Sequence, residues 1–141
     1  MSAYAFKVDL PGFEPMSLGT SGSGRHVKKG SLLEAIRSKA GNEELDKAKS
    51  AFKGKRVGVE VQFRLWKGDE HHPESVGRKD LDNLLKGVLD VLQVELDKQT
   101  KEKGLGLIED DDWVFRILAT KKIIEEPSNK GLTLTISALE P

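Results

Sequence analysis

Residues 56–66 have the sequence RVGVEVQFRLW, the clearest strand pattern in this chain of 141 residues. Apolar side chains stand at every second position from Val57 to Leu65, and glycine, charged or amide residues stand between them. Side chains of a β-strand point alternately to the two faces of a sheet, so a period of two predicts a strand with one buried face. A sheet that is apolar on one face needs a covering layer, and we expect helices to supply it.

The other periodic segments supply further strands and the covering helices. Ser31 and Glu34 form the S-x-x-E pattern of a capping box, which favours a helix that begins there. The order strand, helix, strand, helix, strand, strand predicts a single α/β or α+β domain over residues 1–141, with a mixed sheet and helices packed on one face. Strands are predicted at residues 4–10, 56–66, 113–124 and 131–139, and helical segments at residues 31–40, 42–52 and 80–97.

Two connecting segments are predicted to be loops. Residues 11–30 contain seven Gly or Pro residues, which favour turns over regular structure. The segment ends in a basic cluster, so we expect a flexible basic loop that can contact a polyanion. Residues 98–103 are polar and are followed by the turn Gly104-Leu105-Gly106, so residues 98–106 are predicted to be a loop insertion. The basic cluster consists of Arg25, His26, Lys28 and Lys29.

The composition excludes several classes of protein. The chain has no cysteine, which rules out disulfides, thiolate zinc sites, iron–sulfur clusters and a cysteine nucleophile. No uncharged apolar stretch approaches the roughly 18 residues of a bilayer-spanning helix, and the first residues lack the pattern of a signal peptide. We therefore expect a cytoplasmic protein with no membrane partner.

Charge is balanced overall but not along the chain. Lys and Arg number 23, as do Asp and Glu. Residues 1–58 hold 11 basic and 6 acidic side chains, whereas residues 59–141 hold 12 basic and 17 acidic ones. This division suits a protein that binds both a polyanion and divalent cations. It also suits a small domain kept in solution by mixed surface charge, so charge alone does not decide between the two.

Three carboxylates are candidates for a metal site. Asp80 and Asp82 stand at the predicted start of a helix, and Asp111 lies within the acidic run of residues 109–112. Inside a helix the first two would point about 200° apart, but with Asp80 still extended and Asp82 in the first turn their oxygens can converge. A third carboxylate from a neighbouring segment would complete an oxygen site of the kind that Mg²⁺ prefers. Lys86, one turn after Asp82, can reach the same site or a bound phosphate.

Each part of this pattern also has a purely structural interpretation. Asp is common at a helix start because it accepts hydrogen bonds from free backbone amides. A run of acidic residues is commonly a solvated turn, and a charged helix stripe is commonly a set of weak surface ion pairs. Composition and spacing alone therefore leave two alternatives open, a metal-dependent hydrolase and a purely structural role for these residues.

Several of these segments together resemble one known family. They are RKDLDNLLK at residues 78–86, the pattern Asp110-Asp111-x-x-Val114, and GLTLTI at residues 131–136. In this combination and order they resemble the RusA family of Holliday-junction resolvases, which are small homodimeric endonucleases. The resemblance covers roughly residues 56–138 and implies a RusA-like fold.

The resemblance also implies an activity and a set of site residues. The activity is Mg²⁺-dependent cleavage of four-way DNA junctions by paired symmetric nicks in DNA recombination and repair, with Mn²⁺ able to replace Mg²⁺. The implied partners are branched DNA and a second copy of the chain in a homodimer. The implied site residues are Asp80, Asp82, Asp111 and the adjacent Asp110 for the metal, Lys86 as the catalytic or phosphate-neutralising lysine, and Arg78 and Lys79 at the DNA backbone.

Other functions remain open beside a junction endonuclease. A non-catalytic module that binds branched DNA would not need the acids, which repel DNA unless they are neutralised. A metal-dependent phosphoesterase on another substrate would need the acids without junction selectivity. The metal-binding acid within residues 109–112 is also open, although Asp111 puts Val114 where the family pattern has it. The basic clusters Arg25–Lys29 and Lys53–Arg56 are predicted to contact duplex arms, with an affinity that falls steeply with salt.

Overall fold

The structure is a computed structural model that describes residues 4–13, 23–66, 81–97, 102–109 and 111–139. For residues 23–30, 82–83, 95–97, 102 and 111 it describes the backbone alone. The elements are β1 (Ala5–Pro11), α1 (Ser23–Ala40), α2 (Asn42–Phe52), β2 (Val57–Trp66), α3 (Leu81–Leu92), β3 (Glu95–Asp97), β4 (Glu102–Lys103), β5 (Val114–Ile124) and β6 (Gly131–Ala138), with the 3₁₀ helices η3 (Asp111–Trp113) and η4 (Pro127–Asn129) before the last two strands.

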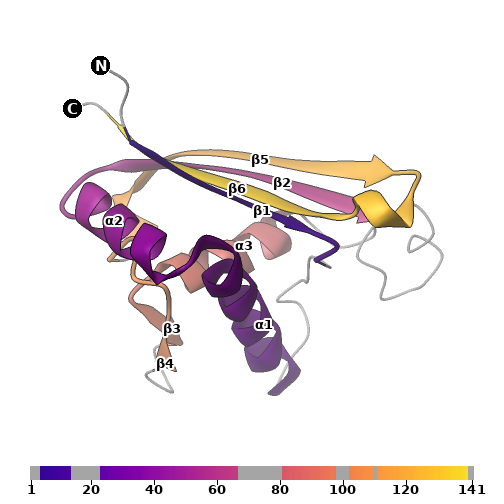
Figure 1. Ribbon diagram of the computed structural model, residues 1–141, viewed down its shortest axis with the longest axis horizontal. Helices are drawn as coiled ribbons and strands as arrows, with labels where there is room; N and C mark the ends of the chain where they lie inside the picture. Colours follow the sequence, from indigo (N-terminus) through magenta and orange to yellow (C-terminus); the bar gives the residue numbers. More distant parts are fainter. Residues whose placement is uncertain (1–3, 14–22, 67–80, 98–101, 110, 140–141) are drawn as a thin grey trace.

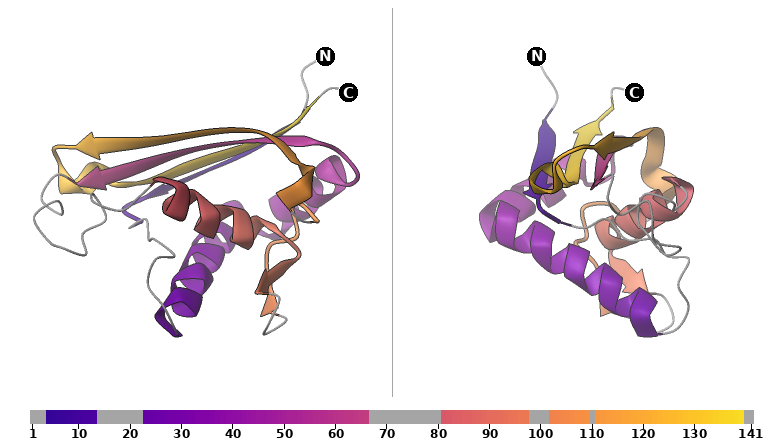
Figure 2. Two further views of the ribbon diagram at one scale, coloured as in Figure 1. Left: turned by 180° about the vertical axis from the view of Figure 1, so that it is seen from behind. Right: turned by 90° about the vertical axis from the view of Figure 1, so that its right-hand side faces the viewer.

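Four strands form one mixed sheet in the order β1-β6-β2-β5. β6 pairs antiparallel with β1 and β2, whereas β2 and β5 run parallel and are joined by a crossover that contains α3. The helices lie on one face of the sheet (Figures 1 and 2). The predicted fold class, a small α+β domain with a mixed sheet, is therefore confirmed. None of the helices formed by the described residues is long and apolar enough to cross a membrane.

The buried face of β2 forms the centre of the core. Val57, Val59, Val61, Phe63 and Leu65 are all at most 2% exposed, which confirms the alternation predicted from the sequence. They belong to one cluster with buried side chains from the three helices and from β1 and β6. Burial of apolar surface, at roughly 25 cal/mol per Å², is the main contribution that holds the helices to the sheet.

α1 corrects two predictions. The helix begins at Ser23, so the loop predicted for residues 11–30 is wrong from that residue onward, and Ser31 lies inside the helix rather than at its start. Leu33 and Ile36 anchor the helix in the core, and further turns can then be added without new nucleation. The two glycines in this stretch each weaken it by only about 1 kcal/mol. The basic cluster of Arg25, His26, Lys28 and Lys29 thus lies on a helix, with its side chains outside the described residues.

α3 is shorter than the helix predicted for residues 80–97, because it ends at Leu92. β3 follows it and pairs with β4, so part of the predicted loop at residues 98–106 is a strand. Helix ends are fixed where other groups satisfy the last carbonyls. Here the returning chain does so, since the amide of Leu107 donates to the carbonyl of Leu92 at 2.9 Å. A contact between segments distant in sequence therefore sets this helix end.

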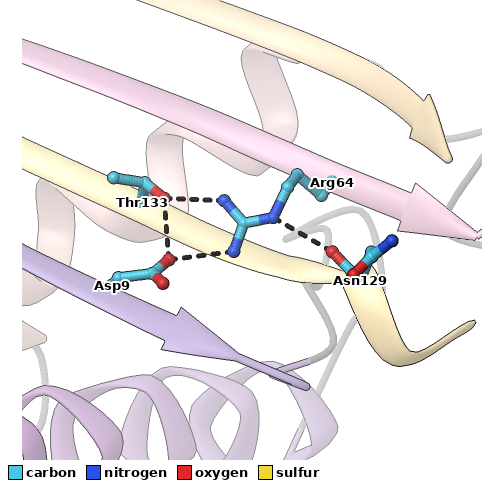
Figure 3. Close-up of polar contacts among 4 residues, drawn as sticks. All are labelled: Asp9, Arg64, Asn129 and Thr133. Carbon is cyan, nitrogen blue, oxygen red and sulfur yellow. Dashed lines mark hydrogen bonds and ion pairs between the residues drawn. The ribbon is translucent and has the colours of Figure 1, made fainter.

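A polar cluster joins β2, β6 and β1 on the face opposite the helices (Figure 3). Arg64 donates from Nη1 to Oγ1 of Thr133 at 2.6 Å, from Nη2 to Oδ1 of Asp9 at 2.9 Å, and from Nε to the carbonyl of Asn129 at 3.0 Å. The hydroxyl of Thr133 donates in turn to Asp9 at 2.8 Å. This hydrogen bond, with the hydrogen bond and charge of Arg64, lowers the pKa of Asp9 below its ordinary value of 3.8, although burial opposes the change.

Tyr4, the residue before β1, contacts α2 through its hydroxyl and its ring. Tyr4 donates from its hydroxyl to Oε1 of Glu44 at 2.8 Å, and its ring meets that of Phe52 edge to face with centroids 5.6 Å apart. The ammonium of Lys47 lies 5.5 Å from the centre of the tyrosine ring. Burial, with the hydrogen bond and charge of Glu44, raises the pKa of Tyr4 to about 12.

Candidate functional site

The start of α3 carries the first of the predicted acids. The helix begins at Leu81, so Asp82 lies in its first turn, as predicted. A carboxylate in the first turn is stabilised by free backbone N–H groups and by the helix dipole. The side chain of Asp82 lies outside the described residues, and so do Asp80, Arg78 and Lys79 entirely.

The buried stripe of α3 determines which of its faces meets solvent. Leu84, Val88 and Leu92 are at most 1% exposed and pack against the sheet. Lys86 is exposed and lies one turn after Asp82. Residues four apart on a helix have Cβ atoms about 5–6 Å apart on the same face. The helix backbone therefore places Lys86 on the same face of α3 as Asp82.

The acidic run ends in a 3₁₀ turn that leads directly into β5. Asp111 begins η3, and Val114 begins the strand and pairs with the start of β2. Glu109 and Asp112 are exposed. Asp110 and the side chain of Asp111 lie outside the described residues, so the choice of Asp111 as the metal-binding acid remains a prediction from the sequence.

The two groups of acids are attached to opposite ends of α3. The amides of Leu107 and Ile108 both donate to the carbonyl of Leu92, at 2.9 and 3.2 Å, which holds this segment at the C-terminal end of the helix. Asp82 precedes Leu92 by ten residues, or about 15 Å along a helix. The three residues from Ile108 to Asp111 span at most about 10 Å. The acidic run must therefore turn back along α3 if Asp111 is to share one ion with Asp82.

A basic hollow lies beside the acidic run. It has a volume of about 160 Å³ and is formed by the end of α2, the turn after it and the segment that precedes η3. The charged residues of its lining are Lys49, Lys53, Lys55 and Glu109, and Trp113 forms part of its wall. The lining residues carry a net positive charge, which favours the approach of an anion such as a phosphate. The hollow therefore places three lysines next to the acidic run.

The described part of the chain by itself contains no candidate metal site. Within those residues, no group of three or more His, Asp or Glu side chains is placed to hold a metal ion. Asp9 is engaged by Arg64 and Thr133, so its carboxylate stabilises the sheet. The acids at the start of α3 and before β5 remain the candidates, on the strength of their sequence pattern.

Comparison with known proteins adds no family assignment. No family model matches the sequence, and no curated protein matches it. The resemblance to the RusA family therefore rests on the sequence segments quoted above alone.

Proposed function

We propose that this protein is a Mg²⁺-dependent, structure-selective endodeoxyribonuclease that resolves four-way DNA junctions by paired symmetric nicks. The observation that carries the proposal is the combined spacing of Asp80, Asp82, Lys86 and Asp111. Two structural features support it. Asp82 lies in the first turn of α3, and Lys86 is exposed one turn later. Four-way junctions form when DNA undergoes recombination and repair, so the proposal includes those processes. We also propose a cytoplasmic location.

The donor set suits a hard divalent cation. Asp80, Asp82, Asp111 and the adjacent Asp110 offer carboxylate oxygens, and Mg²⁺ prefers oxygen ligands while keeping water and a substrate phosphate as its others. When bound, the ion would activate water and neutralise charge at the scissile phosphate. Lys86 would hold a positive charge close to that phosphate, where negative charge increases in the transition state.

Basic residues outside the acids would hold the DNA backbone. The hollow beside the acidic run is lined by three lysines, which would contact a backbone phosphate of the bound DNA. Each contact between a basic side chain and a phosphate releases counterions, so affinity should fall steeply as salt increases. The residues proposed to contact DNA are Lys49, Lys53, Lys55, Arg78 and Lys79, together with Arg25, His26, Lys28 and Lys29 on α1.

The proposal requires Asp82 and Asp111 to meet at one ion although they are attached to opposite ends of α3. Carboxylates repel one another until a cation neutralises them, so metal binding would favour the approach of the acidic run. Paramagnetic Mn²⁺ tests this, because it broadens the NMR signals of nearby amides. We expect substoichiometric Mn²⁺ to broaden the amide signals of both residues equally; broadening of one alone would contradict a shared site.

Cleavage of a synthetic four-way junction, with a linear duplex of the same sequence as the reference, tests the activity. With Mg²⁺ we expect symmetric nicks in the junction alone. Asp82→Asn should lower the rate at least about 100-fold, because it removes a charged ligand of the ion. Asp46→Asn makes the same chemical change at an exposed position of α2 and should leave the rate unchanged.

The other outcomes separate the competing functions. Junction binding that is unaffected by a chelator, without nicks in Mg²⁺ or Mn²⁺, would contradict the nuclease and favour a non-catalytic module that binds branched DNA. Metal-dependent hydrolysis of small phosphoesters, with junctions left intact, would favour a phosphoesterase with another substrate.

A further inference from the structure

The basic hollow beside the acidic run has an apolar floor. Phe52, Leu107 and Ile108 belong to its lining and are at most 4% exposed, because they are part of the core. Trp113 is half-buried and contributes its indole to the wall. An aromatic face beside buried apolar side chains is a surface on which a second flat ring can pack.

The exposed residues of the same lining are mostly basic. Lys49 lies on α2, Lys53 and Lys55 lie in the turn that follows the helix, and all three are exposed. Three lysines against Glu109 leave an excess of two positive charges in the described part of the lining. Lys49 extends from α2 to the segment before η3, since a Cβ at Gly106 would lie 3.7 Å from its Cε. The rim of the hollow is therefore positive where its floor is apolar.

The volume of the hollow limits what it can take. It is about 160 Å³, whereas a pocket that encloses a whole drug-sized ligand has roughly 300–1,000 Å³. One flat ring system can enter it, and a sugar or phosphate attached to that ring would stay outside, among the lysines. An apolar ring that carries an anion on a short polar spacer is the chemical form of a nucleotide, whose base stacks on aromatic side chains.

The two halves of the hollow are held in place before any ligand binds. α2 and the start of β5 lie at the same end of the sheet (Figures 1 and 2). The amides of Leu107 and Ile108 donate to the carbonyl of Leu92, and the side chains of both residues are in the core. A wall that is already ordered loses little conformational entropy on binding.

We propose that the basic hollow binds one unpaired nucleotide of a DNA strand, with the base against Trp113 and the neighbouring phosphates at the three lysines. A base inside a duplex is stacked between its neighbours and must leave the stack to enter a pocket, so the site selects unpaired nucleotides. The sugar stays outside the hollow, so the strand can continue in both directions. Binding needs neither the metal nor the acids of the proposed cleavage; that the strand is DNA rests on the proposed function.

The fluorescence of Trp113 tests whether a base enters the hollow. Trp66, the other tryptophan of the chain, pairs with Ile124 at the far end of β5, so Trp66→Phe leaves Trp113 as the reporter. With a chelator present, we expect a short single-stranded oligodeoxynucleotide to quench the signal, because a base stacked on an indole quenches it. An abasic deoxyribose-phosphate chain of the same length should bind at least about 5-fold more weakly and leave the signal unchanged.

Three results of this titration would overturn the proposal. Equal affinity for the abasic chain would show that the base makes no contact. Equal quenching by a closed duplex of the same sequence would show that the site does not select unpaired nucleotides. Binding of deoxyadenosine monophosphate as tight as that of the oligodeoxynucleotide would show a site for a free nucleotide instead of a strand.

The salt dependence of binding tests the lysines. Lys53→Gln and Lys55→Gln each remove one phosphate contact and should each lower the slope of log affinity against log salt by about 0.7. Lys7→Gln makes the same change at an exposed position of β1 and should leave the slope unchanged. A circular dichroism melt confirms that each variant is folded. Slopes that stay at the wild-type value in both variants of the turn would overturn the proposed phosphate contacts.

The binding and cleavage experiments fail independently. Quenching by a single strand, without cleavage of the junction, supports the nucleotide site and contradicts the proposed function. Cleavage of the junction by a protein whose Trp113 no strand quenches supports the function and contradicts the nucleotide site.

Discussion

The two edge strands of the sheet, β1 and β5, meet solvent in different ways. β1 alternates strictly, with Phe6, Val8 and Leu10 at most 5% exposed and the positions between them exposed. β5 carries apolar side chains on both faces, and its Phe115 is 59% exposed. α1 lies against β1 (Figure 1), whereas the apolar residues of β5 have no comparable cover among the described residues.

This difference shows that an edge strand is shielded from solvent by packed helices and polar contacts, and that the alternation of its own side chains is not sufficient. β1 has helices on one face and the Arg64 cluster on the other. It also ends at Pro11, which cannot donate a backbone hydrogen bond to an added strand. β5 has eleven residues and none of these protections among the described residues, so it is the less shielded edge of the sheet.

The largest expected effect comes from removing the same side chain at the two edges. Phe6→Ala should lower the free energy of unfolding by about 3–5 kcal/mol, because it leaves a cavity in the core. Phe115→Ala should lower it by less than about 1 kcal/mol, because little buried surface is lost. Urea unfolding at a concentration where the chain is monomeric measures both. Equal losses would show that the β5 edge is as well buried as β1.

A smaller effect is expected where β6 passes β1. Gly131 has φ +152°, and a Cβ there would contact the carbonyl oxygen of Leu10 and lie 2.8 Å from Nη2 of Arg64. Gly131→Ala should therefore lower the free energy of unfolding by about 2–3 kcal/mol. The control Gly12→Ala meets nothing within 4 Å at φ +80° and should lower it by only about 1 kcal/mol. If the two losses were equal, the close packing inferred at β1 would be wrong.

The smallest effect concerns Asp9, which helps to complete the β1 edge. Its side chain is 51% exposed, so solvent screens its ion pair, and Asp9→Asn should lower the free energy of unfolding by about 0.5–1 kcal/mol near neutral pH. Because folding lowers the pKa of Asp9 below its ordinary value of 3.8, this contribution is present above that unfolded value and is lost as pH falls through the folded pKa. The difference between wild type and variant should therefore shrink in urea titrations at decreasing acidic pH. A difference that grows on acidification would contradict the lowered pKa.

The candidate site was predictable only in its local parts. The position of Asp82 in a first helical turn and the exposure of Lys86 follow from a helix start and an amphipathic stripe, which are properties of neighbouring residues. The sequence also indicated the basic cluster Lys53–Arg56, but it gave no sign that Lys49 belongs to the same hollow as Glu109. No spacing connects those two residues, because the fold alone brings the end of α2 beside the acidic run.

The errors in the predicted elements have a related cause. The helix start at Ser23 was missed because a glycine-containing segment has low helix propensity by itself and becomes helical as an extension of a helix anchored by Leu33 and Ile36. The end of α3 at Leu92 was missed because it depends on an amide from Leu107, which lies beyond a hairpin.

By itself the sequence determined the strand β2, its buried face and the α+β class, because side-chain alternation and helix amphipathicity arise between residues a few positions apart. Only the tertiary structure decided that β5 is an edge, that Arg64 reaches Asp9, and that the two groups of acids are attached to opposite ends of α3. Strand order and hydrogen-bond partners depend on which distant segments pack together, and no local period in the chain encodes that choice.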